Sequence, residues 1–214
     1  MKKTWAAVLI SVSLMQGLSG CAALAVGGLA AGGLSAVDRR STGSQADDQL
    51  IELQVSNNIT TYLRNQYAAD VYNNVKVISY NRSVLLIGMV SDQNAKDTAE
   101  RIARSQSSVN RVFNHIDIGA ERSINAAQDT WITSKIRAML LQPKGYNPSH
   151  VKITTFNGTT YAQGVLTPEE QAAINQQIST TLGVQKVVTL YETFVSTNVS
   201  STVKVDNTDT NAPL

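Results

Sequence analysis

Residues 75–90 read VKVISYNRSVLLIGMV, and residues 151–166 read VKITTFNGTTYAQGVL. Each stretch holds an apolar run, a short polar break and a second apolar run with a glycine at the same place. Asn157-Gly158 is a strong two-residue turn signal, because both residue types tolerate a positive φ. Asn81-Arg82-Ser83 is its weaker counterpart. We therefore expect a β-hairpin in each stretch, and an internal repeat in the chain.

A helical pattern precedes each hairpin, with apolar residues recurring every three or four positions. The faces expected to point inward are Ile51, Val55, Ile59, Tyr62 and Leu63 in the first repeat and Ile132, Ile136, Met139 and Leu140 in the second.

A second helix follows each hairpin and begins at a capping signal, Ser91-Asp92 or Thr167-Pro168-Glu169-Glu170. A closing strand, at 109–118 or 184–195, ends each unit. The predicted fold class is α+β. It consists of two α-β-β-α-β domains, each a three-stranded sheet with two helices on one face.

The first residues have the order of a bacterial secretory signal. Met1-Lys2-Lys3 is a basic start, and the apolar run 5–18 is too short and interrupted for a stable membrane-spanning helix. It ends in Leu18-Ser19-Gly20-Cys21, which resembles a lipobox and holds the sole cysteine. We expect cleavage before Cys21 and acylation of its thiol, with several acyl chains giving stable attachment. Ala22 in place of Asp favours the outer membrane.

These patterns divide the chain into six expected segments: a signal peptide at 1–20, a lipidated flexible tether at 21–46, a first domain at 47–118, a linker at 119–127, a second domain at 128–195 and a disordered tail at 196–214. The tether is rich in Ala and Gly, and its Arg39-Arg40 pair is expected to be solvated or to touch lipid phosphates. The tail has little apolar content.

Composition excludes several classes of function. The chain has 18 Lys and Arg against 16 Asp and Glu, and removing Lys2 and Lys3 with the signal leaves equal numbers. We therefore expect no nucleic-acid partner. One cysteine and two distant histidines are too few for a metal site. No hydrolase, zinc-protease, P-loop or dinucleotide-binding motif occurs, so we expect no enzyme, no catalytic residue and no cofactor beyond the lipid on Cys21.

The repeated V-K-V/I start, the hairpin, the glycine placement, the capped helix and the closing 109–112 (VNRV) or 184–187 (VQKV) resemble the BON domain. The resemblance covers roughly residues 18–195. It implies a lipid-anchored protein of the outer membrane that faces the periplasm and maintains envelope integrity, with a place at division sites. Its implied ligands are anionic phospholipids, phosphatidylglycerol and cardiolipin, bound through the second BON domain.

The helix at the start of the second repeat is the predicted lipid-binding element. On a helical wheel its outer side holds Trp131, Ser134, Ala138 and Leu141, with the cations Lys135 and Arg137 close by. A large aromatic flanked by cations suits a membrane interface, where the ring enters the headgroup region and the cations meet phosphates. The alternative is that Trp131 packs on the edge of its own domain, since tryptophan is usually largely buried.

The run 84–90 is apolar on both faces of its strand, whereas helices cover only one face. The other face, with Leu85 and Ile87, must meet something else. Contact with the second repeat is the expectation, because exposed apolar patches of that size are uncommon. The alternative function is a protein-interaction scaffold that uses Leu85 and Ile87 to assist outer-membrane protein assembly.

Overall fold

The computed structural model describes residues 38–119, 125–142 and 145–195. The expected signal peptide, Cys21, most of the tether, part of the linker and the tail lie outside the described residues. No helix within the described ranges is long and apolar enough to cross a membrane.

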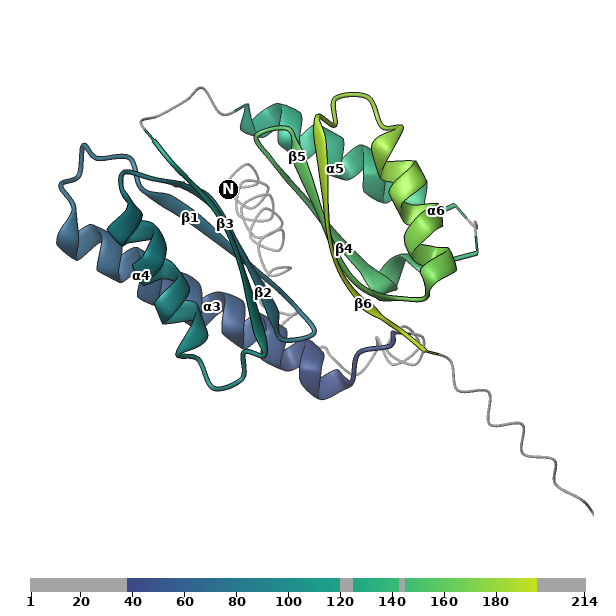
Figure 1. The fold of residues 1–214 in the computed structure, drawn as a ribbon, viewed down its shortest axis with the longest axis horizontal. Coiled ribbons are helices and arrows are strands. Elements are labelled where there is room, and N and C mark those ends of the chain that lie inside the picture. The colour runs from purple at the N-terminus through teal and green to yellow at the C-terminus, as the bar shows by residue number, and fades with distance from the viewer. Residues whose placement is uncertain (1–37, 120–124, 143–144, 196–214) are drawn as a thin grey trace, which may run out of the picture.

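Each repeat folds into one domain with the predicted element order (Figure 1). The first domain consists of α3 (Thr42–Gln66), β1 (Asn74–Tyr80), β2 (Ser83–Val90), α4 (Gln93–Arg104) and β3 (Arg111–Ile118). The second consists of α5 (Ala126–Leu140), a 3-10 turn (Pro148–His150), β4 (Val151–Phe156), β5 (Thr159–Leu166), α6 (Pro168–Ser179) and β6 (Lys186–Thr193).

The two sheets have the same topology. The central strand, β2 or β5, pairs antiparallel with its hairpin partner and parallel with the closing strand, β3 or β6. Both helices of a domain cover one face of its sheet (Figure 1). The α+β prediction of two three-stranded sheets, each with two helices on one face, is therefore confirmed.

Local signals set the elements as predicted. The Asp92 side chain accepts the amide N–H of Ala95 at the start of α4, and Thr167 with Glu170 forms a capping box at the start of α6. The hairpin turns have positive φ at Asn81, Arg82, Asn157 and Gly158. Nearly all the apolar residues predicted to face inward on α3 and α5 are buried, with Tyr62 and Met139 packed at the edge of the cores.

The repeated glycine of the central strand has a steric cause. A Cβ on Gly88 would lie 2.1 Å from the carbonyl oxygen of Asn74, and a Cβ on Gly164 would lie 2.7 Å from that of His150. Both distances are too short for any side chain. Glycine therefore lets the chain at the start of the edge strand, β1 or β4, approach the central strand.

An aspartate near the start of each first helix holds the following hairpin turn, a feature that the sequence reasoning missed. The Asp48 carboxylate accepts the amide N–H groups of Asn81 and Arg82, and Asp129 accepts those of Asn157 and Gly158. Both aspartates are buried. The sequence does contain a signal for this contact, since an Asp stands three residues before the first inward-facing isoleucine in each repeat.

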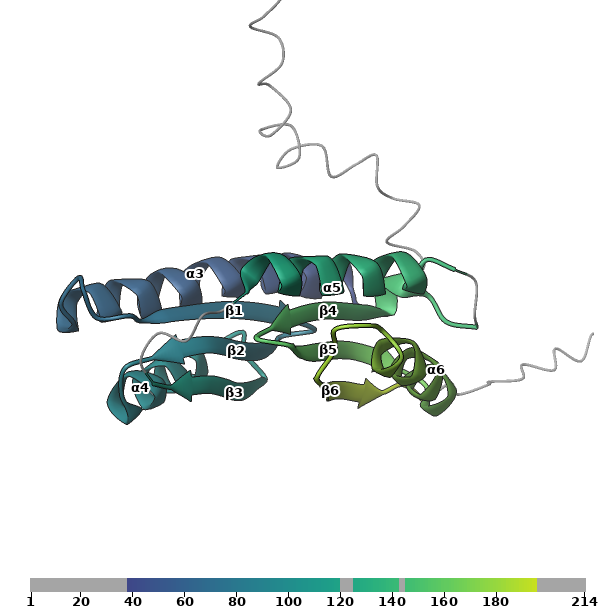
Figure 2. The ribbon, with the colours of Figure 1, turned by 90° about the horizontal axis from the view of Figure 1, so that it is seen from above.

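The two domains pack through the sheet faces that the helices leave open. Ile78, Leu85 and Ile87 of the first domain form one apolar cluster with Tyr161 of the second, and Phe113, Phe156, Val188 and Leu190 pack around it. The two sheets thus lie between the two pairs of helices, while α3 and α5 lie at the same edge, next to β1 and β4 (Figures 1 and 2). The predicted contact between the repeats is the one that the structure shows.

The last residues of the expected flexible tether differ from the prediction, because they are folded against the two domains. The helix α3 begins at Thr42, with Ser41 as its N-cap, so residues 42–46 belong to the first domain. The side chains of Arg39 and Arg40 are largely buried, each with 17% of its surface exposed. Arg39 forms an ion pair with Glu170 of the second domain and donates a hydrogen bond to the carbonyl of Val165. Because both arginines have carboxylate partners, this segment is folded onto the protein and does not hang as a loose linker.

Candidate functional site

The outer side of α5 carries the side chains predicted to bind lipid. Trp131 is 50% exposed, so the alternative of an indole packed into the domain edge is not what the structure shows. The ammonium of Lys135 lies 4.7 Å from the centroid of the indole ring, a cation–π contact one helical turn away. Leu141 is also exposed, at the end of the helix.

A groove between α5 and the edge strand β4, here called the α5 groove, collects four of the predicted residues. Its volume is about 560 Å³. It is lined by Ser134, Arg137, Ala138, Leu140 and Leu141 of the helix region and by Pro148, Val151, Lys152 and Ile153. Trp131 and Lys135 are not among the lining residues, so the predicted site consists of a groove and a separate exposed aromatic.

The two cations of the groove are held in place differently. The Arg137 guanidinium donates one hydrogen bond to the carbonyl of Ile153, 2.9 Å away, and its side chain is exposed. Lys152, which the sequence reasoning missed, forms an ion pair with Glu52 and donates to the carbonyl of Ser79, both in the first domain. Arg137 has hydrogen-bond donors left for an anion, because only one of its five N–H groups is engaged by this bond.

The first domain has a corresponding groove, the α3 groove, of about 540 Å³. It is lined by Gln49, Glu52, Leu53, Ser56 and Asn57 of α3 and by Asn74, Val75, Lys76 and Val77. Counted from the turn-binding aspartate, Ser56 holds the place of Arg137 and Leu50 that of Trp131. At these two positions, the exposed aromatic and the arginine therefore occur only in the second domain.

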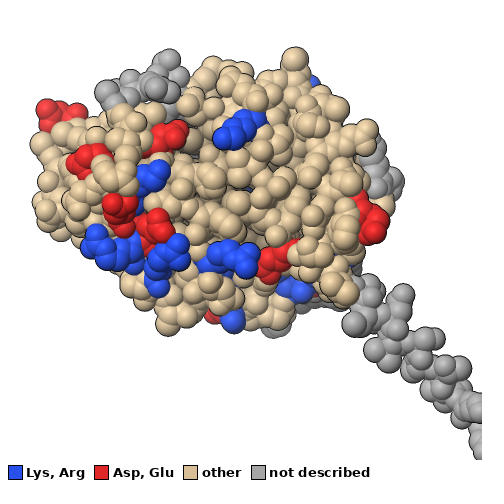
Figure 3. Space-filling view, viewed as in Figure 1, with Lys and Arg blue, Asp and Glu red and all other residues tan. Residues whose placement is uncertain are grey.

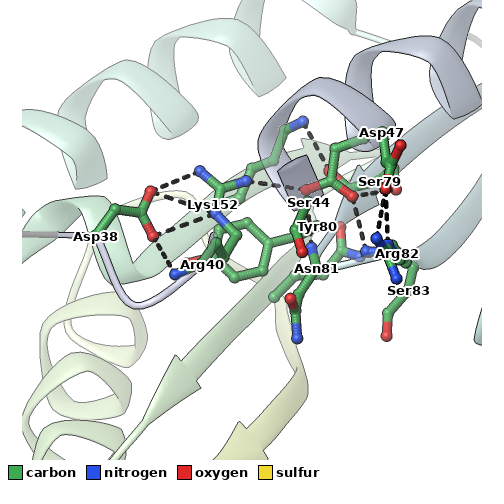
Figure 4. A network of polar contacts seen from close by, with 12 residues as sticks. Asp38, Arg40, Ser44, Asp47, Ser79, Tyr80, Asn81, Arg82, Ser83 and Lys152 are labelled. Atoms are coloured by element: carbon green, nitrogen blue, oxygen red, sulfur yellow. Dashed lines mark hydrogen bonds and ion pairs between the residues drawn. The ribbon is translucent and has the colours of Figure 1, made fainter. Parts of the chain in front are cut away.

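A polar network joins the start of the described chain to both domains (Figure 4). Arg40 forms ion pairs with Asp38 and Asp48 and lies over the ring of Tyr80, whose hydroxyl donates to the carbonyl of Ser149. Burial raises the pKa of Tyr80 above the range of an exposed phenol. The network consists of paired groups and is structural in character.

The other polar cluster surrounds Glu170, at the start of α6. Burial works to raise the pKa of this carboxyl, but the hydrogen bonds from Arg39 and from the Thr167 amide prevail and hold it below its ordinary value. His150 Nδ1 lies 3.6 Å from the same carboxylate. Glu170 thus remains charged and ties the segment before α3 to the second domain.

Within the described residues, no group of three or more His, Cys, Asp or Glu side chains is arranged to hold a metal ion. On the face seen in Figure 3, positive and negative side chains alternate over the first domain, and the surface of the second is mostly uncharged.

Leu85 and Ile87, the residues of the alternative protein contact, are fully buried. They lie in the apolar cluster between the sheets. The alternative expectation that Leu85 and Ile87 contact another protein is therefore wrong, because the second domain already covers both side chains.

The fold and site together define a class of protein: two copies of an α-β-β-α-β module packed sheet to sheet, with an exposed aromatic on one copy. The BON domain model matches residues 51–120 and 128–191. The chain therefore belongs to the BON domain family.

Comparison with curated proteins gives similar relatives. The chain is 30% identical to the outer membrane lipoprotein DolP of Haemophilus influenzae, over 87% of this chain and 94% of that protein. It is 31% identical to a 21 kDa hemolysin of Actinobacillus pleuropneumoniae, over 71% of this chain and 77% of that one. Among solved structures, the C-terminal domain of CdsD from Chlamydia trachomatis aligns with 15% identity over 64% of this chain and 63% of that one, with a TM-score of 0.24.

Proposed function

We propose that this protein is a non-enzymatic outer-membrane lipoprotein, anchored through Cys21 and facing the periplasm, whose second domain binds anionic phospholipid through α5. Its relative DolP is by name an outer membrane lipoprotein, and the lipobox motif supports the anchor. The observation that carries the lipid-binding part is Trp131, half exposed on a helix whose duplicate has leucine at the same place. An aromatic side chain that is not needed for packing is suited to the headgroup region.

The cations around Trp131 supply the preference for negative lipid. Lys135 and Arg137 are expected to meet phosphates, and a basic residue near an anionic surface contributes about 1 kcal/mol. Two such residues amount to about 2 kcal/mol, or roughly thirtyfold in affinity. This is modest for capture from solution. It is enough to orient a protein that lipid already holds at a high local concentration.

The α5 groove offers a place for the part of the lipid below the phosphate. Ala138 is small and leaves room beside the helix, while Leu141 and Ser134 line the groove on either side of it. Phosphatidylglycerol and cardiolipin combine a phosphate with a short polyol, so both fit this combination of donors and apolar surface. We extend the proposal to a role in envelope integrity at division sites, as the family resemblance implies.

A vesicle-binding measurement tests the proposal. The full mature chain with Cys21→Ser, which cannot be acylated, is mixed with phosphatidylethanolamine vesicles with or without phosphatidylglycerol or cardiolipin. We expect flotation with the anionic vesicles and little with neutral ones. Trp131→Glu is expected to abolish binding, because a carboxylate would have to enter the headgroup region.

Leu50→Glu on the corresponding position of α3 is the matched control, since it makes the same change of charge on an exposed site of the first domain. Equal loss from both variants would mean that net charge alone decides binding. No binding of the parent chain to any anionic vesicle contradicts the proposal.

A second candidate function, a scaffold for outer-membrane protein assembly, is favoured by a different surface from the one first expected. Leu50 and Leu53 are both exposed on α3, beside the α3 groove. A photocrosslinker at Leu53 that captures an outer-membrane assembly protein in cells would support it. Capture from Trp131 alone would count against it.

A further inference from the structure

The turn between α6 and β6 presents an apolar side chain to solvent. The amide of Val184 donates to the carbonyl of Thr181 at 3.2 Å, and Gly183 has a φ of 96°, so Leu182 and Gly183 are the central residues of a hydrogen-bonded turn. Leu182 is 74% exposed, the highest fraction among the large hydrophobic side chains that the structure describes. Most of this side chain therefore lies outside the packed interior of its own domain.

Side-chain hydrogen bonds to the backbone hold this turn at the end of α6. The hydroxyls of Thr180 and Thr181 donate to the carbonyls of Gln176 and Gln177 at the end of α6, and Thr181 is buried. These bonds satisfy backbone carbonyls that the last turn of a helix leaves unpaired. The exposure of Leu182 therefore comes from a defined backbone conformation.

The same turn packs against the first part of α5. A Cβ on Gly183 would lie 3.1 Å from Cδ1 of Ile132, the residue that follows Trp131. Figure 1 shows the turn after α6 beside the beginning of α5. Leu182 and Trp131 thus belong to the same end of the second domain and come from two elements that touch.

The first domain closes the turn before β3 with the corresponding hydrogen bond, but without the positive φ of Gly183 and without the apolar residue. There the amide of Val109 donates to the carbonyl of Gln106 at 3.0 Å, and Ser107 and Ser108 are the central residues. The turn therefore does not need leucine in order to form. At this turn, as at the positions of Leu50 and Trp131, the larger exposed apolar side chain is on the second domain.

The segment before α3 keeps the second domain near the bilayer that Leu182 would enter. Arg39 binds Glu170 and Val165, and lies over the ring of Phe194, so the chain that comes from Cys21 is fastened to the second domain. Residues 22–37 span at most about 55 Å when fully extended. A bilayer that holds the acyl chains is therefore always within reach of this domain.

We propose that Leu182 is a second membrane-inserting residue, which enters the headgroup and upper acyl region of the bilayer together with Trp131. The proposal rests on the lipid-binding function of α5. Two apolar anchors on different elements fix the tilt of the domain as well as its attachment, whereas one anchor leaves rotation about itself free. Lys135 then lies beside the inserted indole and meets lipid phosphate.

The direct test replaces the leucine by the residue of the first domain. In the unacylated full chain, Leu182→Ser is expected to weaken binding to phosphatidylglycerol vesicles about tenfold, since it removes most of an apolar side chain from the membrane. Leu50→Ser is the matched control, because Leu50 is 54% exposed on the first domain. It is expected to leave binding unchanged.

The outcomes separate this inference from the function on which it rests. If Leu182→Ser binds like the parent chain while Trp131→Glu does not bind, the turn is not an anchor and lipid binding by α5 stands. If neither variant differs from the parent, both proposals fail. Equal weakening by Leu182→Ser and Leu50→Ser also overturns the inference, because the effect is then not specific to the turn.

A fluorescent label gives a second readout that does not depend on affinity. Leu182→Cys in the Cys21→Ser chain, labelled with an environment-sensitive dye, is expected to shift its emission to the blue on addition of anionic vesicles. Ser107→Cys, labelled in the same way, is expected to show no shift. A blue shift at position 182 that depends on protein concentration and not on vesicles would identify a second copy of the chain as the occupant and overturn the inference.

Discussion

Asp48 in the first domain and Asp129 in the second stand at the same point of their helices, and each carboxylate binds the backbone of the hairpin turn that follows. Two residues further along, the first domain has Leu50 and the second has Trp131. At the turn before the closing strand, the first has Ser107 and the second has Leu182. The positions that build the module are thus duplicated, and the exposed positions differ. The second domain thus differs from the first in the side chains that it exposes, while the fold of the two is the same.

The interface between the sheets is the place where the two domains depend on each other most. Leu85→Ala removes a fully buried side chain from the apolar cluster and is expected to lower the free energy of unfolding by about 2–5 kcal/mol. Chemical denaturation followed by circular dichroism measures this. We expect the single transition to broaden or divide as the domains uncouple. An unchanged midpoint would show that the sheets do not pack in solution as described.

The two turn-binding aspartates, Asp48 and Asp129, should differ in their contribution to the free energy of unfolding. Asp48 also accepts the hydroxyl of Ser79 and pairs with Arg40, so Asp48→Ala leaves more buried donors unpaired than Asp129→Ala does. We expect losses of about 3 kcal/mol and about 2 kcal/mol, since each buried group left unsatisfied costs about 1–3 kcal/mol and the structure relaxes in part. Denaturant titration of both variants measures the difference. A larger loss for Asp129→Ala would reverse the comparison.

The cations sharpen the difference between the two grooves. Arg137→Ala is expected to weaken binding to anionic vesicles about fivefold, corresponding to about 1 kcal/mol for one basic residue at the surface. Lys76→Ala, in the α3 groove, is expected to have no effect on binding. Flotation at low and high salt measures both, and the loss from Arg137→Ala should shrink as salt screens the attraction. Equal losses would make the two domains equivalent binders.

The smallest effect is confined to acid pH and concerns the link from Arg39 to the second domain. Because the folded-state pKa of Glu170 is depressed, its contribution to stability is present above the ordinary value of 4.5 and is lost as pH falls through the folded value. We expect the thermal unfolding temperature to fall in this range. Glu170→Gln should flatten that decrease, and an identical pH profile would contradict the assignment.

Much of the fold could be predicted from local pattern. The asparagine-containing turns, the Asp92 and Thr167 caps and the inward isoleucines of α5 act over a few residues, so their sequence signals are readable. The apolar character of both faces of β2 also predicted the contact between the repeats. The candidate site was predicted in part, because helical periodicity identifies the outer side of α5.

The remainder of the site depends on residues that are distant in sequence. Lys152 lines the α5 groove because β4 lies beside the helix. Leu182 can be assigned to the same site as Trp131 only because its turn contacts Ile132 in α5. The pairing of Arg39 with Glu170 joins residues that are 131 positions apart in the sequence. Periodicity within one element carries no information about such pairs.

The amino-acid sequence by itself determined the duplicated module, the turn and cap positions, the lipobox with its single cysteine and the asymmetry between Leu50 and Trp131. Only the tertiary structure decided which side chains of the second sheet cover Leu85 and Ile87, that the arginines before α3 are bound to the protein, and that the α6–β6 turn lies against α5. The physical reason is range. Propensity, capping and turn geometry act between neighbours along the chain, whereas ion pairs and apolar contacts across the interface form only after both domains have folded.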